Sequence, residues 1–510
     1  MRSNIKYVIQ YGQALALTIA LTVAIAMALA PQCFAREEYT RNFDKTVPLA
    51  SGQSVRLEHH MGNVTIRTHG KAEVQIHATI RASASNDAEA KRFADQVQIE
   101  VATAGSALVI RTEYPKEEHT GFLGLRYLSF SVDYEVIMPE TAPLELRNSF
   151  GAVSIDGLKA NADVVNSHGK LAFHNGRGTQ RLENSFAEVE VAANSGDVSI
   201  RNGNGAVDVV DVTGVVNVKN RFANVTVTNP GHGATIVNGN GSVQVSGAGG
   251  DLRITNSFGR VTANGVKGNL VVGNSNGEVD ANSVSGSAEL NTSFGAVRFS
   301  DIGKQLSVRA TNSAVKGRKV GESAIIENSF GPVDVAEVHK GIRIVGGNSS
   351  ITVTDVGEEA SLKTSFGTVT AERVGGSLTV EDSNGAVKAS ALRSGANVKT
   401  SFAVVLLDGV GGSVDVENQN GGVDVSLLGQ QCRAVTIRTS FSPVRVRVPD
   451  NASYAVAART SFGKIHTDFP LTVSGEVNAD ALSGTIGGGG CSMRLTDNNG
   501  SIEILKGGKS

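Results

Sequence analysis

A short motif that recurs at a fixed spacing constrains this chain more than any other feature. One copy runs Asn256-Ser257-Phe258-Gly259-Arg260-Val261, and near-copies place a phenylalanine every 36 residues without insertion or deletion. These phenylalanines are Phe150, Phe186, Phe222, Phe258, Phe294, Phe330, Phe366 and Phe402. Halfway between them a sister motif has Asn, or His at position 168, in place of the aromatic residue, so the unit is 18 residues. A fixed period of this kind is typical of repeat architectures.

Apolar residues alternate on both sides of the glycine turn in every unit. Leu252 and Ile254 alternate before the turn, and Val261 and Ala263 alternate after it. The column of Val261 is apolar in sixteen consecutive units from 153 to 423, and the column of Ile254 never breaks. A period of two predicts two short strands in each unit. Helical repeats need a period of 3.6 and tolerate far less glycine, so they are excluded.

An 18-residue unit of two short strands cannot bury its apolar face alone. Stacked on its neighbours it predicts an all-β parallel solenoid of about sixteen coils, roughly 75 Å long at the spacing of paired strands. Asn256 and its equivalents from Asn148 to Asn274 are predicted to form a ladder whose amides bond each other and the turn backbone. Gly259 and its equivalents at 151, 169, 205, 241, 277, 295, 331, 367, 385 and 421 are predicted to need a positive φ.

The chain divides into four segments. Residues 1–35 have a basic start, the apolar run Ala14–Ala30 and small residues near Ala35, which predicts a cleaved export signal, with an uncleaved anchor as the alternative. Residues 36–145 are predicted to form a β-rich cap with one short helix at Asn86–Ala94. Residues 146–430 form the solenoid. In residues 431–510 the spacing slips, because Phe441 and Phe462 are out of phase, and this segment is predicted to be a degenerate capping end.

Composition sets limits on partners. The formal charge is −2 at pH 7, which does not predict nucleic acid as a partner. No segment after the export signal is apolar enough to cross a membrane, so we expect no membrane span in the mature chain. Cys432 and Cys491 would pair in an oxidising compartment, or else stay as separate thiols, and no histidine spacing turns them into a zinc site.

The succession of Asn-Ser-Phe-Gly-x-Val and Asn-x-Asn-Gly-x-Val units behind an export signal resembles a large bacterial family of adhesin-like β-strand-repeat proteins. The resemblance covers roughly residues 40–510. It implies a secreted or envelope-located β-solenoid with no assigned reaction and no catalytic residues. Its motifs are short, so they indicate the fold far better than an activity.

The phenylalanine at the corner of every second coil is the most informative candidate for function. If the ring is half exposed, the eight phenylalanines form a ridge with one ring about every 9.6 Å, and such an apolar stripe usually marks an interaction surface. The simpler interpretation, which we take as the default, is that each ring folds inward, or over its Asn neighbour, and belongs to the core. Which way the ring of Phe258 points decides between them.

Two other groups of residues are considered as candidate binding sites. Arg298, Lys316, Arg318 and Lys319 form a basic patch that would suit an anionic polysaccharide, although acidic residues nearby dilute it. His59, His60, His69 and His77 lie close in sequence, but no carboxylate or cysteine recurs beside them at ligand spacing, so neither a metal nor another cofactor is expected. Systematic calcium sites are not expected either, because no column is consistently acidic.

The sequence favours a non-enzymatic exported protein of the periplasm, cell surface or medium that adheres or scaffolds through a long repetitive surface. Its partner would be a surface, matrix or envelope protein or polysaccharide. The first alternative is a carbohydrate-active β-helix enzyme at the basic patch, although no unit has the long inserted loop that a catalytic cleft would need. The second is a periplasmic sensor or assembly partner that acts through the caps.

Overall fold

The computed structural model describes residues 38–84, 86–115, 128–429, 431, 433–473, 478 and 480–507. The export signal predicted for residues 1–35 and Cys432 lie outside these ranges. The chain has two compact units: a smaller one of residues 1–43, 78–99 and 113–133, and a larger one of residues 44–77, 100–112 and 134–510. The repeats belong to the larger unit.

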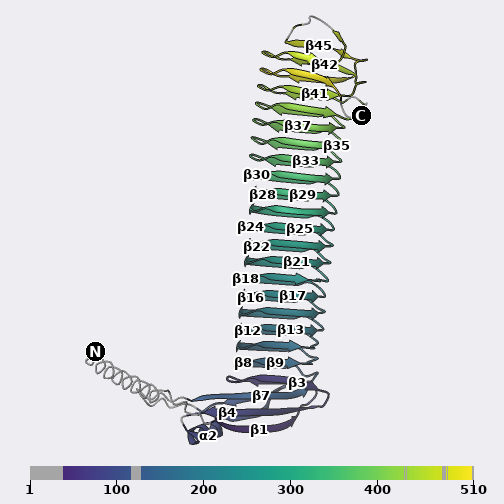
Figure 1. Ribbon diagram of the computed structural model, residues 1–510. Coiled ribbons are helices and arrows are strands. Elements are labelled where there is room, and N and C mark those ends of the chain that lie inside the picture. The colour runs from purple at the N-terminus through teal and green to yellow at the C-terminus, as the bar shows by residue number, and fades with distance from the viewer. Residues whose placement is uncertain are drawn as a thin grey trace, which may run out of the picture. The chain divides into compact units, whose positions relative to one another are not determined.

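The larger unit is a parallel β-solenoid, which confirms the predicted fold class (Figure 1). In the regular coils the first strands form one sheet: β8 (Leu144–Phe150), β10 (Ala162–His168), β12 (Gln180–Phe186), β14 (Val198–Asn204), β16 (Val216–Phe222), β18 (Ala234–Asn240), β20 (Leu252–Phe258), β22 (Leu270–Asn276), β24 (Ala288–Phe294), β26 (Leu306–Asn312), β28 (Ala324–Phe330), β30 (Ile342–Asn348), β32 (Ala360–Thr364), β34 (Leu378–Asp382), β36 (Ala396–Thr400) and β38 (Val414–Asn418).

The second strands of the same coils form the other sheet. They are β9 (Val153–Asp156), β11 (Leu171–His174), β13 (Val189–Asn194), β15 (Val207–Val212), β17 (Val225–Pro230), β19 (Val243–Ser246), β21 (Val261–Val266), β23 (Val279–Val284), β25 (Val297–Ile302), β27 (Val315–Val320), β29 (Val333–Val338), β31 (Ile351–Val356), β33 (Val369–Val374), β35 (Val387–Leu392), β37 (Val405–Val410) and β39 (Val423–Leu427).

Strand pairing keeps the register of the sequence repeat. Asn256 pairs with Asn238 in the preceding coil and with Asn274 in the next, each 18 residues away. Val261 pairs in the same way with Val243 and Val279. Because a slip of one residue would turn every apolar side chain outward, the unbroken apolar columns hold this register.

The core is a stack of small apolar side chains between the two sheets. Ile254 and Val261 are completely buried, as are most of their equivalents. A large ring interrupts the column at Phe299, which is 3% exposed and pairs with Ala281 on one side and Gly317 on the other. A Cβ atom on Gly317 would lie 2.3 Å from the ring of Phe299, so the missing side chain of one coil makes room for the large side chain of the next.

The chain order of the coils changes at both ends of the solenoid. At the N-terminal end β2 (Ser54–Glu58) pairs with both β8 and β6 (Ala107–Glu113), and β3 (Val64–His69) pairs with both β9 and β7 (Ser129–Pro139). Residues 54–69, predicted to belong to a cap, therefore form a coil between that of β6 and β7 and the first regular coil.

The C-terminal end repeats this interleaving. β40 (Val435–Arg438) and β41 (Val444–Val448) follow the last regular coil, and β46 (Cys491–Thr496) and β47 (Ile502–Lys506) stack on them. β42 (Tyr454–Arg459) and β43 (Ile465–Thr467), which come earlier in the chain, form the next coil outward. β45 (Ala481–Ile486) pairs antiparallel with β42 and with β44 (Leu471–Val473), so it covers an open strand edge.

The smaller unit contains the predicted short helix. This is α2 (Asp87–Gln96), whose N-cap residue Asn86 accepts a hydrogen bond from the backbone N–H of Glu89 at 2.9 Å. Its buried Phe93 lies with its ring centroid 4.6 Å from that of Phe130. The strands β1 (Glu38–Pro48), β4 (Glu73–Ser83) and β5 (Gln98–Ala104) are each divided between the two units.

Among the residues that the structure describes, no helix has both the length and the apolar character that crossing a membrane would require.

Candidate functional site

A column of phenylalanine rings follows the corner where the first strand of a coil turns into the second. The eight predicted rings are exposed over 44% (Phe222) to 62% (Phe402) of their surface. The rings are therefore half exposed, and the part of the default interpretation in which each ring folds inward is wrong. We call the column formed by Phe150, Phe186, Phe222, Phe258, Phe294, Phe330, Phe366, Phe402, Phe441 and Phe462 the phenylalanine ridge.

The asparagine two residues earlier holds each corner in place. The buried Asn256 donates from Nδ2 to the carbonyl oxygens of Phe258 and Gly259 in its own turn, at 3.1 and 3.3 Å, and of Gly241 in the preceding coil, at 3.2 Å. Strict strand alternation would turn residue 258 inward like Asn256, so the exposure of Phe258 shows that the alternation ends at this corner. The ladder amides thus bond the turn backbone as predicted, whereas a bond between two ladder amides is recorded for Asn148 and Asn166 alone among the described residues.

The glycine after the corner lets consecutive coils approach closely. Gly259 has a φ of 115°, and a Cβ atom there would lie 2.3 Å from the carbonyl oxygen of Gly241. A positive φ is confirmed at nine of the eleven predicted glycines and is wrong for Gly385 and Gly421. At those two positions the close approach alone requires glycine, since a Cβ atom would lie 1.8 and 2.0 Å from the carbonyl oxygens of the coil before.

The first three corner residues show how the rings are oriented. The imidazole of His168 lies between Phe150 and Phe186, with centroid separations of 4.5 and 4.7 Å and interplanar angles of 15° and 13°. The three rings are therefore stacked along the solenoid with their faces toward one another. Where Asn replaces His168, an asparagine side chain stands between two phenylalanines, and we call each such position a slot.

The alternation of Phe with another residue continues in space where the chain order changes. In sequence the spacing breaks after Phe402, but the stacking order at the C-terminal end is Phe402, Asn420, Phe441, Asn499 and Phe462. Backbone bonds align these corners: Ser440 donates to Gln419, Asn499 to Ser440, and Phe462 to Asn498. Phe441 and Phe462 are 60% and 84% exposed, so the ridge extends over coils that were predicted to be degenerate.

A polar groove of about 790 Å³ borders the central part of the ridge. The residue that precedes the corner contributes Ser257, Ser275, Ser293, Thr311 and Ser329 to its lining. Their hydroxyl groups are both donors and acceptors. The ridge therefore combines an apolar crest with a hydroxyl-rich flank.

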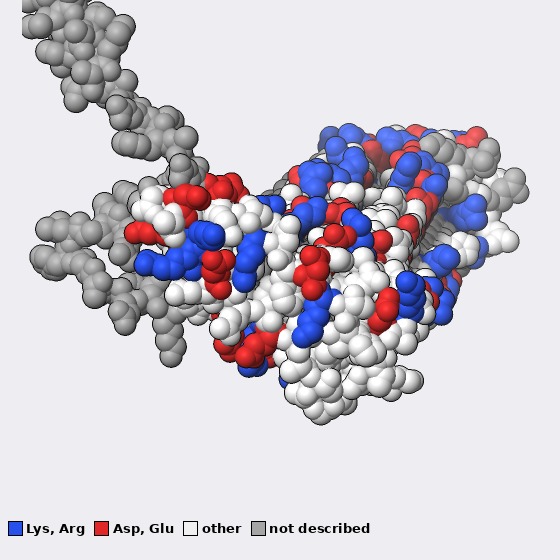
Figure 2. Space-filling view, turned by 90° about the horizontal axis from the view of Figure 1, so that it is seen from below, with Lys and Arg blue, Asp and Glu red and all other residues white. Residues whose placement is uncertain are grey.

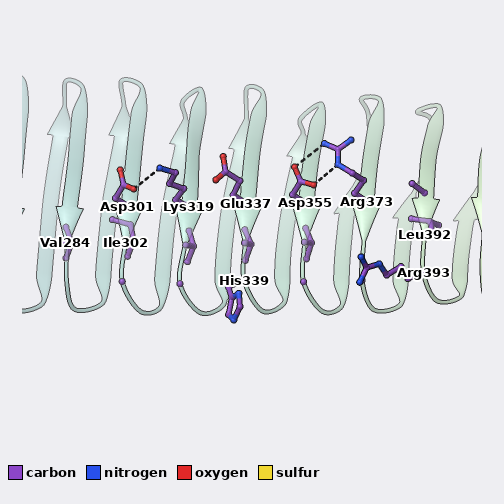
Figure 3. A pocket seen from close by; sticks show the side chains of 18 of the residues that line it. Val284, Asp301, Ile302, Lys319, Glu337, His339, Asp355, Arg373, Leu392 and Arg393 are labelled. Atoms are coloured by element: carbon purple, nitrogen blue, oxygen red, sulfur yellow. Dashed lines mark hydrogen bonds and ion pairs between the residues drawn. The ribbon is translucent and has the colours of Figure 1, made fainter.

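A second groove, of about 1080 Å³, lies where the second strand turns into the next coil (Figure 3). A column of residues there has φ between 54° and 60°, a left-handed conformation that non-glycine residues adopt at a cost of roughly 1–2 kcal/mol each. Within it Lys319 pairs with Asp301 at 3.4 Å, and Arg373 binds both carboxylate oxygens of Asp355 at 2.6 and 3.1 Å. These charges mainly neutralise one another across coils.

The predicted basic patch is largely neutralised too. Arg298 lies 3.0 Å from Glu278, Lys316 lies 3.2 Å from Asp334, and Lys319 is the residue paired with Asp301. The hydrogen bond from Arg298 lowers the pKa of the Glu278 carboxyl group, which keeps that carboxylate charged. Arg318 is exposed. Figure 2 shows the same mixture of signs, with Lys and Arg side chains beside Asp and Glu over the visible face.

The four histidines of the predicted cluster have separate partners. His59 contacts Thr112 at 3.1 Å, His60 contacts Ser149 at 2.8 Å, His69 accepts a hydrogen bond from the N–H of Lys71, and His77 contacts Asp44. Within the described ranges, no three His, Cys, Asp or Glu side chains come together in a way that could hold a metal ion.

Cys491 begins β46 and is disulfide-bonded. Cys432 lies outside the described residues. The pairing of Cys432 with Cys491 stays a prediction.

The fold and the surface define a β-solenoid repeat protein with a continuous aromatic ridge. Comparison with models of known families and with curated proteins gives no match. Solved structures that match include a putative cell adhesion protein from Clostridium sporogenes, which is 8% identical, with a TM-score of 0.15, over 92% of this chain and 100% of that one. At that TM-score the assignment of the fold rests on the strand pairing described above.

Two features of this surface escaped the sequence reasoning. The left-handed column has a signal, because Asn175, Asp211, Asn229, Gly247 and Gly265 lie 18 residues apart or at multiples of 18, and these residue types tolerate positive φ. The place of Phe462 on the ridge depends on the interleaved coil order, which no spacing in the sequence indicates.

Proposed function

We propose that this protein is a non-enzymatic, adhesin-like or scaffold protein that binds an extended partner through the phenylalanine ridge. The observation that carries the proposal is the regular alternation of exposed rings along the corner, which persists where the chain order of the coils changes. Core packing does not require an exposed ring in every second coil, since Asn occupies the same corner in the coils between. Selection for a binding surface explains the alternation better than the requirements of the fold do.

The distribution of exposed apolar residues supports the same proposal. Ten of the fifteen large apolar side chains that are exposed in the described ranges belong to the ridge. Full burial of one such side chain is worth about 1.5–3 kcal/mol, so a half-exposed ring has about 1 kcal/mol left to gain from a partner. Ten weak contacts on one rigid rod add up when the partner is extended and repetitive.

The proposed location follows from the sequence of the first 35 residues. An export signal would place the mature protein in the periplasm, on the cell surface or in the medium, where a surface, matrix or envelope component is the expected partner. We keep a carbohydrate-active enzyme as the alternative, although its basic patch is largely occupied by ion pairs. A sensor or assembly partner that acts through the chain ends is the remaining alternative.

The test of the ridge replaces Phe222, Phe258 and Phe294 together by Asn. Because Asn is the native corner residue of the intervening coils, the solenoid should fold unchanged, which circular dichroism checks. Binding of the purified protein to cell-envelope and matrix preparations should fall at least tenfold. The matched control replaces Val237 and Ile325, which are 42% and 48% exposed away from the ridge, by Thr and should bind as the wild type does.

Equal binding by the ridge variant and the wild type would rule out the ridge as the binding surface. A screen of acidic polysaccharides addresses the enzymatic alternative. Turnover that disappears in the variant with Arg298→Ala and Lys316→Ala would favour the enzyme, and we expect no turnover in either protein.

A further inference from the structure

The corner column is complementary to itself when one copy is turned end over end. In stacking order its residues are Met61, Phe150, His168, Phe186, Asn204, Phe222, Asn240, Phe258, Asn276, Phe294, Asn312, Phe330, Asn348, Phe366, Asn384, Phe402, Asn420, Phe441, Asn499 and Phe462. The series has ten phenylalanines and ten other residues in strict alternation. Reversing an alternating series of even length exchanges the two kinds of position.

An antiparallel neighbour would therefore meet every ring with a slot. Aligned over its full length, Phe150 of one copy faces Asn499 of the other, Phe294 faces Asn312, and Phe462 faces Met61. The two-fold axis passes between the coils of Phe294 and Asn312, so the contact is isologous and closes at two copies. In a parallel pair at equal height, by contrast, ring would meet ring and slot would meet slot.

At one position of the column an aromatic ring stands between two rings of the ridge. Consecutive rings of the ridge are two coils apart, about 9.6 Å at the usual strand spacing. His168 shows what such a slot accepts, since its imidazole is stacked at 4.5 and 4.7 Å between the two neighbouring rings. A phenyl ring entering above Asn from another copy would reach similar stacking distances on both faces, and offset or stacked aromatic pairs are worth about 0.5–1.5 kcal/mol beyond burial of area.

We propose that the phenylalanine ridge is occupied by a second copy of this chain, which runs antiparallel and inserts its rings into the asparagine slots. The inference rests on the proposed function of the ridge as a binding surface and names its partner. His168 already fills one slot, so the opposing Phe441 packs against the edge of that imidazole instead of entering.

The apolar area is sufficient for a stable dimer. Half exposure of a phenylalanine leaves roughly 100 Å² of accessible surface, so ten rings supply about 1,000 Å² on each copy and about 2,000 Å² in total. Stable interfaces typically bury about 1,200–2,000 Å² in total. The residue two positions after the corner is small in some coils, as at Ala152, Ser242, Ala296 and Ala314, and charged in others, as in the ion pairs Lys170–Glu188 and Arg260–Glu278.

The first experiment measures the oligomeric state of the full-length chain by sedimentation at several concentrations. The wild type should be a dimer, and the variant in which Phe222, Phe258 and Phe294 become Asn should dimerise at least 100-fold more weakly. A second variant fills slots by changing Asn240, Asn276 and Asn312 to Phe. It is more apolar than the wild type, yet it should also dimerise more weakly, because ring then meets ring. The control with Val237→Thr and Ile325→Thr should dimerise normally.

The second experiment measures the orientation through single spin labels. Labels on cysteine at Thr311, Ser257 or Ser401 should lie one, five and eleven coils from the same label in the partner, roughly 5, 24 and 53 Å along the rod. A parallel pair would give one short distance at all three positions and would overturn the antiparallel arrangement.

A wild type that stays monomeric at every concentration, or a slot-filled variant that dimerises more tightly, would overturn the proposal. The two hypotheses fail separately. A monomer whose binding to envelope preparations still depends on the ridge refutes the second copy and leaves the proposed function standing, with an envelope component as the occupant. A dimer that is indifferent to the ridge variants refutes the second copy as the occupant of the ridge, and the proposed function fails only if binding to envelope preparations is indifferent to them as well.

Discussion

The packing of large and small side chains in neighbouring coils is tested most sharply by variants of Phe299 and Gly317. Phe299 fills the space that the missing side chain of Gly317 leaves, so each residue fits only in the presence of the other. Phe299→Val leaves a cavity beside Gly317 and should cost about 3 kcal/mol, near the low end of large-to-small changes of phenylalanine. Gly317→Val places its first side-chain carbon within 2.5 Å of three ring atoms of Phe299 and should cost about 3 kcal/mol or more.

The double variant should be close to the wild type. With Val at both positions the column has the residue that it already has at Val227, Val245, Val335 and Val353, all of them buried. We expect the double variant within about 1 kcal/mol of the wild type, so the coupling energy of the cycle should exceed about 3 kcal/mol.

Unfolding in urea gives the change in unfolding free energy for each single variant and for the double variant, provided that the dependence of this free energy on urea concentration is the same in all of them. Because repeat proteins unfold locally, hydrogen exchange of the amides in β25 and β27 should be measured beside it. Additive losses in the double variant would refute the idea that Gly317 is present to accommodate Phe299.

Three further predictions follow from single positions. Gly259→Ala should destabilise the solenoid by at least about 2 kcal/mol in thermal unfolding, because of its positive φ and the 2.3 Å approach to Gly241, whereas Gly273→Ala, with open space around its Cβ position, should be neutral or stabilising; equal effects would contradict the close-approach argument. Burial raises the pKa of the Asp382 carboxyl group in the folded chain, so its contribution to stability is present below the ordinary aspartate pKa and is lost as the pH rises through the folded value. Asp382→Asn should therefore raise the melting temperature at pH 7 and should raise it much less at pH 4. A larger rise at pH 4 than at pH 7 would contradict this account. Asn256→Ala should cost about 1–3 kcal/mol by leaving turn carbonyls without a donor, while Asn312→Ala, at an exposed corner, should cost less than about 0.5 kcal/mol; similar losses would contradict the role assigned to the ladder.

The fold could be predicted from the sequence because the same residue types recur at the same positions of the 18-residue unit in many consecutive coils. Ile254, Asn256, Gly259 and Val261 each have the same role in coil after coil, so periodicity alone assigned the strands and the register. The interleaved ends could not be predicted, since β46 and β47 are separated from the coil that they join by the whole of β42 to β45. That arrangement depends on contacts between distant segments, and no spacing encodes it.

The surface was predicted less completely for a different reason. A corner residue can point either way at similar backbone cost, so the sequence left the direction of Phe258 open, and the default was wrong. In the structure the strand alternation ends after the buried Asn256, whose amide bonds the turn carbonyls, and Phe258 lies outward at the corner. The basic patch does not stand out as a site because Arg298 faces Glu278 in the preceding coil and Lys316 faces Asp334 in the next, in keeping with the dilution by nearby acids that the sequence indicates.

One measurement addresses the ridge directly. The sequence has no tryptophan, so Phe258→Trp introduces a single fluorophore on the ridge, and Val237→Trp introduces one on the outer face of the same sheet. In dilute protein both should emit at long wavelength and be quenched by iodide. On raising the protein concentration, the emission of Trp at position 258 alone should shift to shorter wavelength and become protected. If the emission of Trp at position 258 is already at short wavelength and protected from iodide in the dilute monomer, the rings fold inward and the account of the ridge is wrong.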